Sequence, residues 1–120
     1  MNEKLVNIQG KEVRLLYCAA TENGFERLSG KSIYEIDFNS QNDIITLCLC
    51  AVVAAYSEKD EQPPITSETL LYHAKPKELI ELAKAVIELR AEWYELPKVL
   101  AENLEKENQR SESKGKKAKN

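Results

Sequence analysis

The chain has 120 residues, of which 42% are hydrophobic and 31% are charged, and its formal net charge is −3. This composition is typical of a single soluble globular domain. The first ten residues lack the apolar stretch of a signal peptide, and no apolar run reaches the roughly 20 residues of a membrane span. We therefore expect a cytoplasmic protein without a membrane segment.

The charge is distributed unevenly along the chain. Residues 106–120 contain six basic and two acidic side chains, a net charge of +4, which leaves −7 for the rest. We expect one domain over residues 1–107 and a disordered, solvated basic tail over residues 108–120. The alternative is that the tail contacts an acidic partner or nucleic acid, as in a small helical DNA-associated regulatory protein.

The N-terminal part of the chain predicts a β-hairpin. Two short strands, Lys4–Ile8 and Lys11–Tyr17, flank Gln9-Gly10, where glycine can take the positive φ of a tight turn. A short helix is expected next over residues 18–28, with Gly30 placed to end it. Residues 32–38 alternate apolar and polar side chains, which predicts either a third short strand or an extended connector that places Ile33, Ile36 and Phe38 on the core.

The longest apolar run of the chain is IITLCLCAVVAAY, from Ile44 to Tyr56. We predict a helix from Ser40, which can cap its start together with Asp43, to Ser57. Because this helix is apolar all round, it must be covered on most sides. The alternative is a buried strand over Ile44–Cys50 followed by a turn.

The C-terminal half predicts further helices. Thr66 can cap one whose apolar contacts come from Leu70, Leu71 and Ala74, and Pro76 can occupy the first turn of the next. The core side of this second helix is expected to contain the residues that repeat at helical spacing: Leu79, Leu82, Ala83, Val86 and Ile87, and then Arg90 flanked by Leu89. The fold class is thus mainly α with a small N-terminal β-hairpin, arranged as a compact bundle of four to five helices around a central buried helix.

Four apolar residues lie around and beyond Pro97 at helical spacing: Leu96, Val99, Leu100 and Leu104. This stripe can pack back on the domain or bind a partner as a helix in a groove. These four residues are the candidate partner-binding residues.

The residues that usually carry chemistry are sparse. His73 is the single histidine, no Gly-rich phosphate loop, HExxH or CxxC motif occurs, and three cysteines make no disulfide framework. Cys48 and Cys50 would point about 200° apart on a helix, so they cannot share a metal ion. We read them, with Cys18, as small buried hydrophobes. The tyrosines are not interleaved with basic residues, which disfavours nucleic-acid stacking. We expect no catalytic residue, no metal and no cofactor.

The order of these features resembles the tail assembly chaperones of long-tailed bacteriophages and prophages over residues 11–95. The family has a motif that begins with an aromatic and an acidic residue and ends in Gly-Lys-Ser-hydrophobic. It is matched here by Phe25, Glu26, Ser29, Gly30, Lys31, Ser32 and Ile33. A capping stretch over Asp37–Asp43, the apolar helix and the Ile65-Thr66 start of the next helix follow in the same order. Cys48 and Cys50 are not part of the family pattern.

The resemblance implies a protein that is not an enzyme. Such chaperones bind the tape measure protein in the host bacterial cytoplasm during tail morphogenesis, keep its apolar helices from aggregating, and are absent from the finished virion. In many phages a translational frameshift extends part of the chaperone population at its C-terminus. The expected partner is therefore the tape measure protein or another phage tail protein, and self-association into a homo-oligomer stays open.

Overall fold

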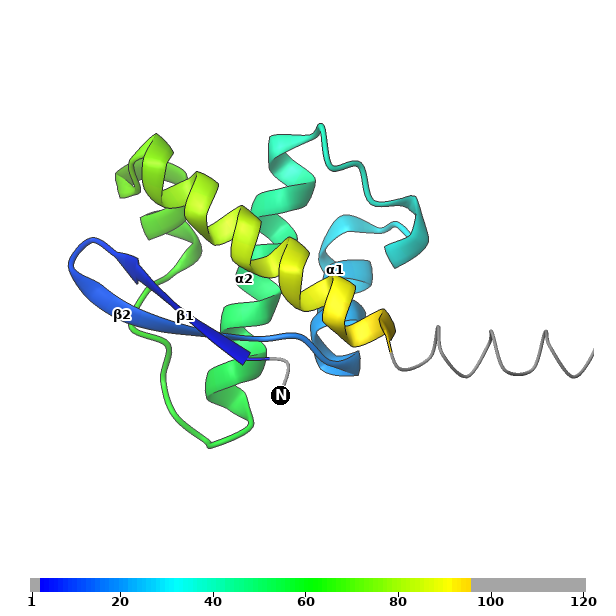
Figure 1. The fold of residues 1–120 in the computed structure, drawn as a ribbon, viewed down its shortest axis with the longest axis horizontal. Coiled ribbons are helices and arrows are strands. Elements are labelled where there is room, and N and C mark those ends of the chain that lie inside the picture. Colours follow the sequence, from blue (N-terminus) through cyan, green and yellow to red (C-terminus); the bar gives the residue numbers. More distant parts are fainter. Residues whose placement is uncertain (1–2, 96–120) are drawn as a thin grey trace, which may run out of the picture.

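The computed structural model describes residues 3–95. The four candidate partner-binding residues, Leu96, Val99, Leu100 and Leu104, therefore lie outside the described residues, as do the domain limit at residue 107 and the basic tail. Within the described part, the protein is predominantly helical with a β-hairpin at its N-terminal end (Figure 1). No helix there is long and apolar enough to cross a membrane.

The hairpin pairs β1 (Glu3–Ile8) with β2 (Lys11–Leu16) in antiparallel register, which confirms the predicted element. Both turn residues, Gln9 and Gly10, have positive φ, at 53° and 75°. Such turns match the right-handed twist of the flanking strands. The side of the hairpin that faces the helices is fully or almost fully buried and consists of Val6, Ile8, Val13 and Leu15.

Helix α1 (Ala19–Ser29) forms where the sequence predicts a helix. Thr21 holds its start, because its hydroxyl donates to the carbonyl oxygen of Leu16 at 2.7 Å and accepts from the backbone N–H of Cys18 at 3.2 Å. Gly30 ends it with φ of 73°, and its N–H donates to the carbonyl oxygen of Glu26. A glycine is favoured there because other residues resist this left-handed conformation.

Residues 33–35 form a single 3₁₀ turn, so the prediction of a third strand is wrong. The backbone N–H of Tyr34 donates to the Ser32 hydroxyl, and the N–H of Ser32 donates to the Glu35 carboxylate. These reciprocal local bonds start a turn in place of a strand. The segment connects α1 to α2 with Ile33 buried, whereas Phe38, expected on the core, is 38% exposed.

Helix α2 (Gln41–Ser57) contains the apolar run, so the alternative of a buried strand is wrong. Ser40 caps it by accepting from the N–H of Asp43 at 3.3 Å. The Asp43 carboxylate does not return to Ser40. It is buried and accepts from the Lys31 ammonium at 2.8 Å and from the N–H of Asp37 at 3.0 Å, and these two bonds lower its pKa. This cluster fixes the connector against the start of α2.

The helix expected from Thr66 is a short turn that continues into the π-helix η2 (Thr69–His73). Its start is held by reciprocal bonds between the hydroxyls and N–H groups of Thr66 and Thr69. So short an element buries one residue, Leu70, and leaves Leu71 56% exposed. The prediction that Leu71 contacts the core is therefore wrong.

A longer helix covers residues 76–95 and crosses α2 (Figure 1). Glu78 anchors its start to the hairpin, because its carboxylate accepts from the N–H of Lys75 at 2.9 Å and from the N–H of Gln9 at 2.7 Å. Its core face is formed by the buried side chains of Leu82, Ala85, Val86 and Leu89. Ile87, predicted on that face, is 43% exposed, because it lies one position off the line that Val86 and Leu89 define.

Candidate helix-binding surface

Helix α2 keeps one apolar line that the described residues cover only in part. Ile45, Leu49 and Val53 follow one another at a spacing of four, so they lie on the same side of the helix. Ile45 and Leu49 are half-buried, and Val53 is 44% exposed. We call these three residues the α2 stripe. Helix α2 packs on α1 and β2, and its side opposite the stripe is almost fully buried at Leu47 and Ala51.

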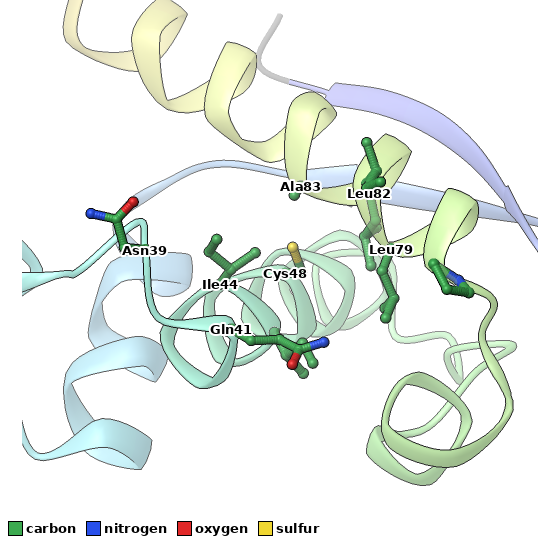
Figure 2. Close-up of a pocket in the computed structure, with 10 residues that line it drawn as sticks. Asn39, Gln41, Ile44, Cys48, Leu79, Leu82 and Ala83 are labelled. Carbon is green, nitrogen blue, oxygen red and sulfur yellow. The ribbon is translucent and has the colours of Figure 1, made fainter.

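A groove lies on one side of the stripe, between the N-terminal half of α2 and the start of the 76–95 helix (Figure 2). This first groove is a hollow of about 330 Å³. Ile44 and Cys48 point into it from α2, and Leu79 and Ala83 approach from the other helix. Apart from the amides of Asn39 and Gln41, its walls are apolar: Ile44, Ile45, Cys48, Pro76, Leu79, Ile80, Leu82 and Ala83.

A second groove of about 510 Å³ lies on the other side of the stripe, between α1 and α2. Gly24 lets these helices approach closely, because a Cβ atom built on it would stand 3.1 Å from the Sγ atom of Cys50. Leu28 at its rim is 67% exposed. The full lining is Ala20, Gly24, Arg27, Leu28, Leu49, Cys50, Val53, Ala54 and Ser57.

The α2 stripe forms a ridge, and the two grooves are the hollows on either side of it. Helices pack by placing side-chain ridges of one into grooves of the other, at interaxial distances of about 8–10 Å. Leu49 and Val53 provide such a ridge at helical spacing, and the two grooves provide room for apolar side chains on both sides of it. This surface suits an apolar helix better than a polar small molecule, which would need converging hydrogen-bonding groups.

The side chains that could take part in catalysis or metal binding do not lie together within residues 3–95. His73 is exposed on η2, and its contact with the hairpin is through its backbone carbonyl oxygen, which accepts from the Gln9 side chain at 2.7 Å. Among residues 3–95, no three His, Cys, Asp or Glu residues are grouped to hold a metal ion.

The cysteines are free thiols. Burial raises the pKa of Cys48 to about 12 and that of Cys50 to about 11, so both stay protonated at neutral pH. The reading as buried hydrophobes is confirmed for these two, whereas Cys18 at the start of α1 is only half-buried. A protonated, buried thiol is a poor nucleophile, so Cys48 and Cys50 act as packing side chains.

Sequence reasoning missed this surface. It expected α2 to be covered and located the partner-binding residues beyond Pro97. The available signal was the apolar character of α2 on every side, because a helix of that kind is stable only when each side is covered. Which side lacks a cover depends on how α1 and the 76–95 helix cross α2, and this crossing is not encoded in the periodicity of α2 itself.

Comparison of the chain with family models, with curated proteins and with solved structures finds no match.

Proposed function

We propose that the protein is a tail assembly chaperone of a long-tailed phage or prophage, which binds apolar helices of the tape measure protein during tail morphogenesis and performs no catalysis. The observation that carries the proposal is the α2 stripe, Ile45, Leu49 and Val53, which the described residues cover only in part and which lies between two apolar grooves. The resemblance over residues 11–95 supplies the identity of the partner.

The physical reason is the cost of leaving apolar surface in water. Burying it stabilises a complex by roughly 25 cal/mol per Å², before the costs of association are subtracted. A partner helix that lies along α2 would cover Leu49 and Val53 and place its own apolar side chains in the two grooves. In the complex, α2 would then be the centre of a bundle of four to five helices, with one of them contributed by the partner.

The proposed partner has the same need. A long helical protein with uncovered apolar faces aggregates unless those faces are covered. A small acidic protein with an apolar ridge can cover such faces and add negative charge to the complex, which favours solubility. This role belongs to the host bacterial cytoplasm, where tails assemble, and it requires the chaperone to be released before the tail is complete.

The test is co-expression of the tagged chain with the tape measure protein of the same phage or prophage. We expect the two to co-purify. The double variant Leu49→Lys/Val53→Lys places two charges on the ridge and should retain at least tenfold less tape measure protein. The matched control is Leu5→Lys, because Leu5 is 56% exposed but lies on β1, away from the grooves.

Each result decides the proposal. Loss of retention in the ridge variant, with retention kept by Leu5→Lys, supports binding along α2. No association of the wild-type chain with the tape measure protein contradicts the proposed function. Equal retention by both variants would show that the partner binds elsewhere on the chain. Circular dichroism of each variant checks that the helices are intact.

A further inference from the structure

The 76–95 helix carries a second apolar line, distinct from its core face. Ile80, Ala83, Ile87, Arg90 and Tyr94 follow one another at alternating spacings of three and four. This is the spacing of the a and d positions of a coiled coil. Ile80 is 60% and Ile87 43% exposed, so the line is not part of the core. We call these five residues the outer seam.

The outer seam lies along two adjoining hollows. Ile80 and Ala83 line the first groove, and Ile87, Arg90 and Tyr94 line a cleft of about 430 Å³. The connector before α2 contributes to both hollows, because Asn39 lines the groove and Phe38, its neighbour in the chain, lines the cleft. From Ile80 to Tyr94 the helix rises about 21 Å, which is four turns of a partner helix.

The cleft contains a cation, Arg90, that forms no ion pair with an acidic side chain of residues 3–95. The Cζ atom of Arg90 lies 5.3 Å from the ring centre of Phe38 and 5.1 Å from that of Tyr94, so the guanidinium is held beside two aromatic rings. Its Nε–H group is buried and has no hydrogen-bond acceptor among residues 3–95. Buried donors of charged groups are rarely left in this state.

The nearby carboxylate of Glu22 does not serve Arg90. It accepts hydrogen bonds from the hydroxyls of Tyr17, at 2.8 Å, and of Tyr94. Burial, together with these bonds, raises the pKa of both tyrosines, which therefore remain donors to Glu22. No ion pair between Arg90 and Glu22 occurs in the described part of the chain. Because Arg90 lines the cleft and has no ion pair within residues 3–95, a carboxylate from outside can approach its guanidinium there.

We propose that the outer seam binds an amphipathic helix of the partner that carries an Asp or Glu opposite Arg90. The proposal rests on the proposed function, which identifies the partner as the tape measure protein. Ile80, Ala83 and Ile87 would contact apolar residues of the partner helix, and Tyr34, 78% exposed beside the cleft, would close over it. A single polar residue in an apolar seam fixes the register of two helices. Arg90 would therefore select which tape measure segments are bound.

A helix with one carboxylate fits better than nucleic acid. Of the described residues that line the cleft, Arg90 is the single cation, whereas the chain up to residue 105 carries a net charge of −7. A polyanion would be repelled by that field, and phosphate contacts gain affinity from several cations together. One carboxylate among apolar side chains needs one guanidinium, which can bind it with two parallel hydrogen bonds.

The test uses the full chain co-expressed with the tape measure protein. Arg90→Glu is expected to lower retention of the tape measure protein at least tenfold, whereas Arg90→Lys keeps the charge, loses the planar fork and should lower it less. The matched control is Lys84→Glu, the same change of charge on the same helix, on the side that faces Leu5 and Val6 of β1. If Arg90→Glu disturbs the fold, Arg90→Gln removes the charge with less repulsion and decides the outcome.

A second measurement identifies the carboxylate. Acidic residues of the retained tape measure segments are changed to Lys one at a time, and one of these changes should restore binding to Arg90→Glu while it weakens binding to the wild-type chain. Equal retention by wild type, Arg90→Glu and Lys84→Glu overturns the inference and leaves the proposed function intact. No retention by wild type overturns the proposed function and this inference with it. Loss in Arg90→Glu of binding to single-stranded DNA, without loss of tape measure protein, assigns the cleft to phosphate and overturns the inference.

Discussion

The close approach of α1 and α2 is the feature whose energetics the structure fixes most sharply. A Cβ atom at Gly24 would stand 3.1 Å from Sγ and 3.4 Å from Cβ of Cys50. Alanine is favoured over glycine inside a helix by about 1 kcal/mol. Overpacking a tight contact costs typically 1–3 kcal/mol. We therefore expect Gly24→Ala to lower the free energy of unfolding by about 1 kcal/mol, although the helix propensity alone would raise it.

The control is Gly24→Ala in a protein that also carries Cys50→Ala, which removes the sulfur atom. In a Cys50→Ala background the 3.1 Å contact is gone, so Gly24→Ala should raise the free energy of unfolding by about 0.5–1 kcal/mol. The coupling between the two positions is then about 1.5–2 kcal/mol, within the range of contacting residues. Urea unfolding of the four proteins, followed by the fluorescence of Trp93, measures it. If Gly24→Ala changes the free energy of unfolding equally in both backgrounds, the Cys50 sulfur does not limit the space at Gly24.

Four further predictions concern the core, the Asp43 carboxylate, the Cys48 thiol and the basic tail. Leu89→Ala, at a fully buried position, should lower the free energy of unfolding by about 3–4 kcal/mol in urea unfolding. Asp43 has a pKa lowered first by Lys31, so its contribution to stability is present above the pKa of the unfolded chain and is lost as the pH falls through the lowered value. The difference in melting temperature between wild type and Asp43→Asn should therefore shrink from pH 7 to pH 3. A thiol reagent at pH 8 should modify Cys48 only in denaturant, because burial raises its pKa to about 12. Deletion of residues 108–120 should leave tape measure binding unchanged in co-purification, and loss of that binding would assign the contact to the tail.

Elements with a strong local signal were predicted well. The hairpin follows from Gln9-Gly10 between two apolar-alternating runs, and both turn residues take the positive φ that such a turn requires. The end of α1 follows from Gly30, and the start of α2 from Ser40. In each case the interaction that starts or ends the element joins residues no more than four positions apart. The local sequence is therefore enough to predict it.

Two errors arose where a local pattern had more than one reading. The alternation over residues 32–38 suggested a strand, but the Ser-x-x-Glu phrase from Ser32 to Glu35 forms reciprocal bonds that start a turn. A capping box was therefore present in the sequence and was passed over. Ile87 was predicted on the core side because it repeats at helical spacing, but the buried side of this helix is formed by Leu82, Ala85, Val86 and Leu89.

The candidate surface could not be predicted, for a different reason. The α2 stripe and the outer seam stay partly exposed because no other described element packs fully over them. Whether an element packs over them depends on contacts between segments far apart in the chain. Arg90 illustrates this, because its setting is made by Phe38 from the connector and by Tyr94 one turn further along its own helix. Sequence spacing gives the contact with Tyr94 but not the contact with Phe38.

The central claim is that the ridge of α2 lies against a helix of the tape measure protein. Photo-crosslinking tests it directly, with a benzophenone amino acid placed at position 53 in one sample and at position 5 in another, because Val53 and Leu5 are both exposed but only Val53 belongs to the α2 stripe. The account predicts a crosslink to the tape measure protein from position 53 and none from position 5. Crosslinks of equal yield from both positions, or none from position 53 while the proteins still co-purify, would contradict it.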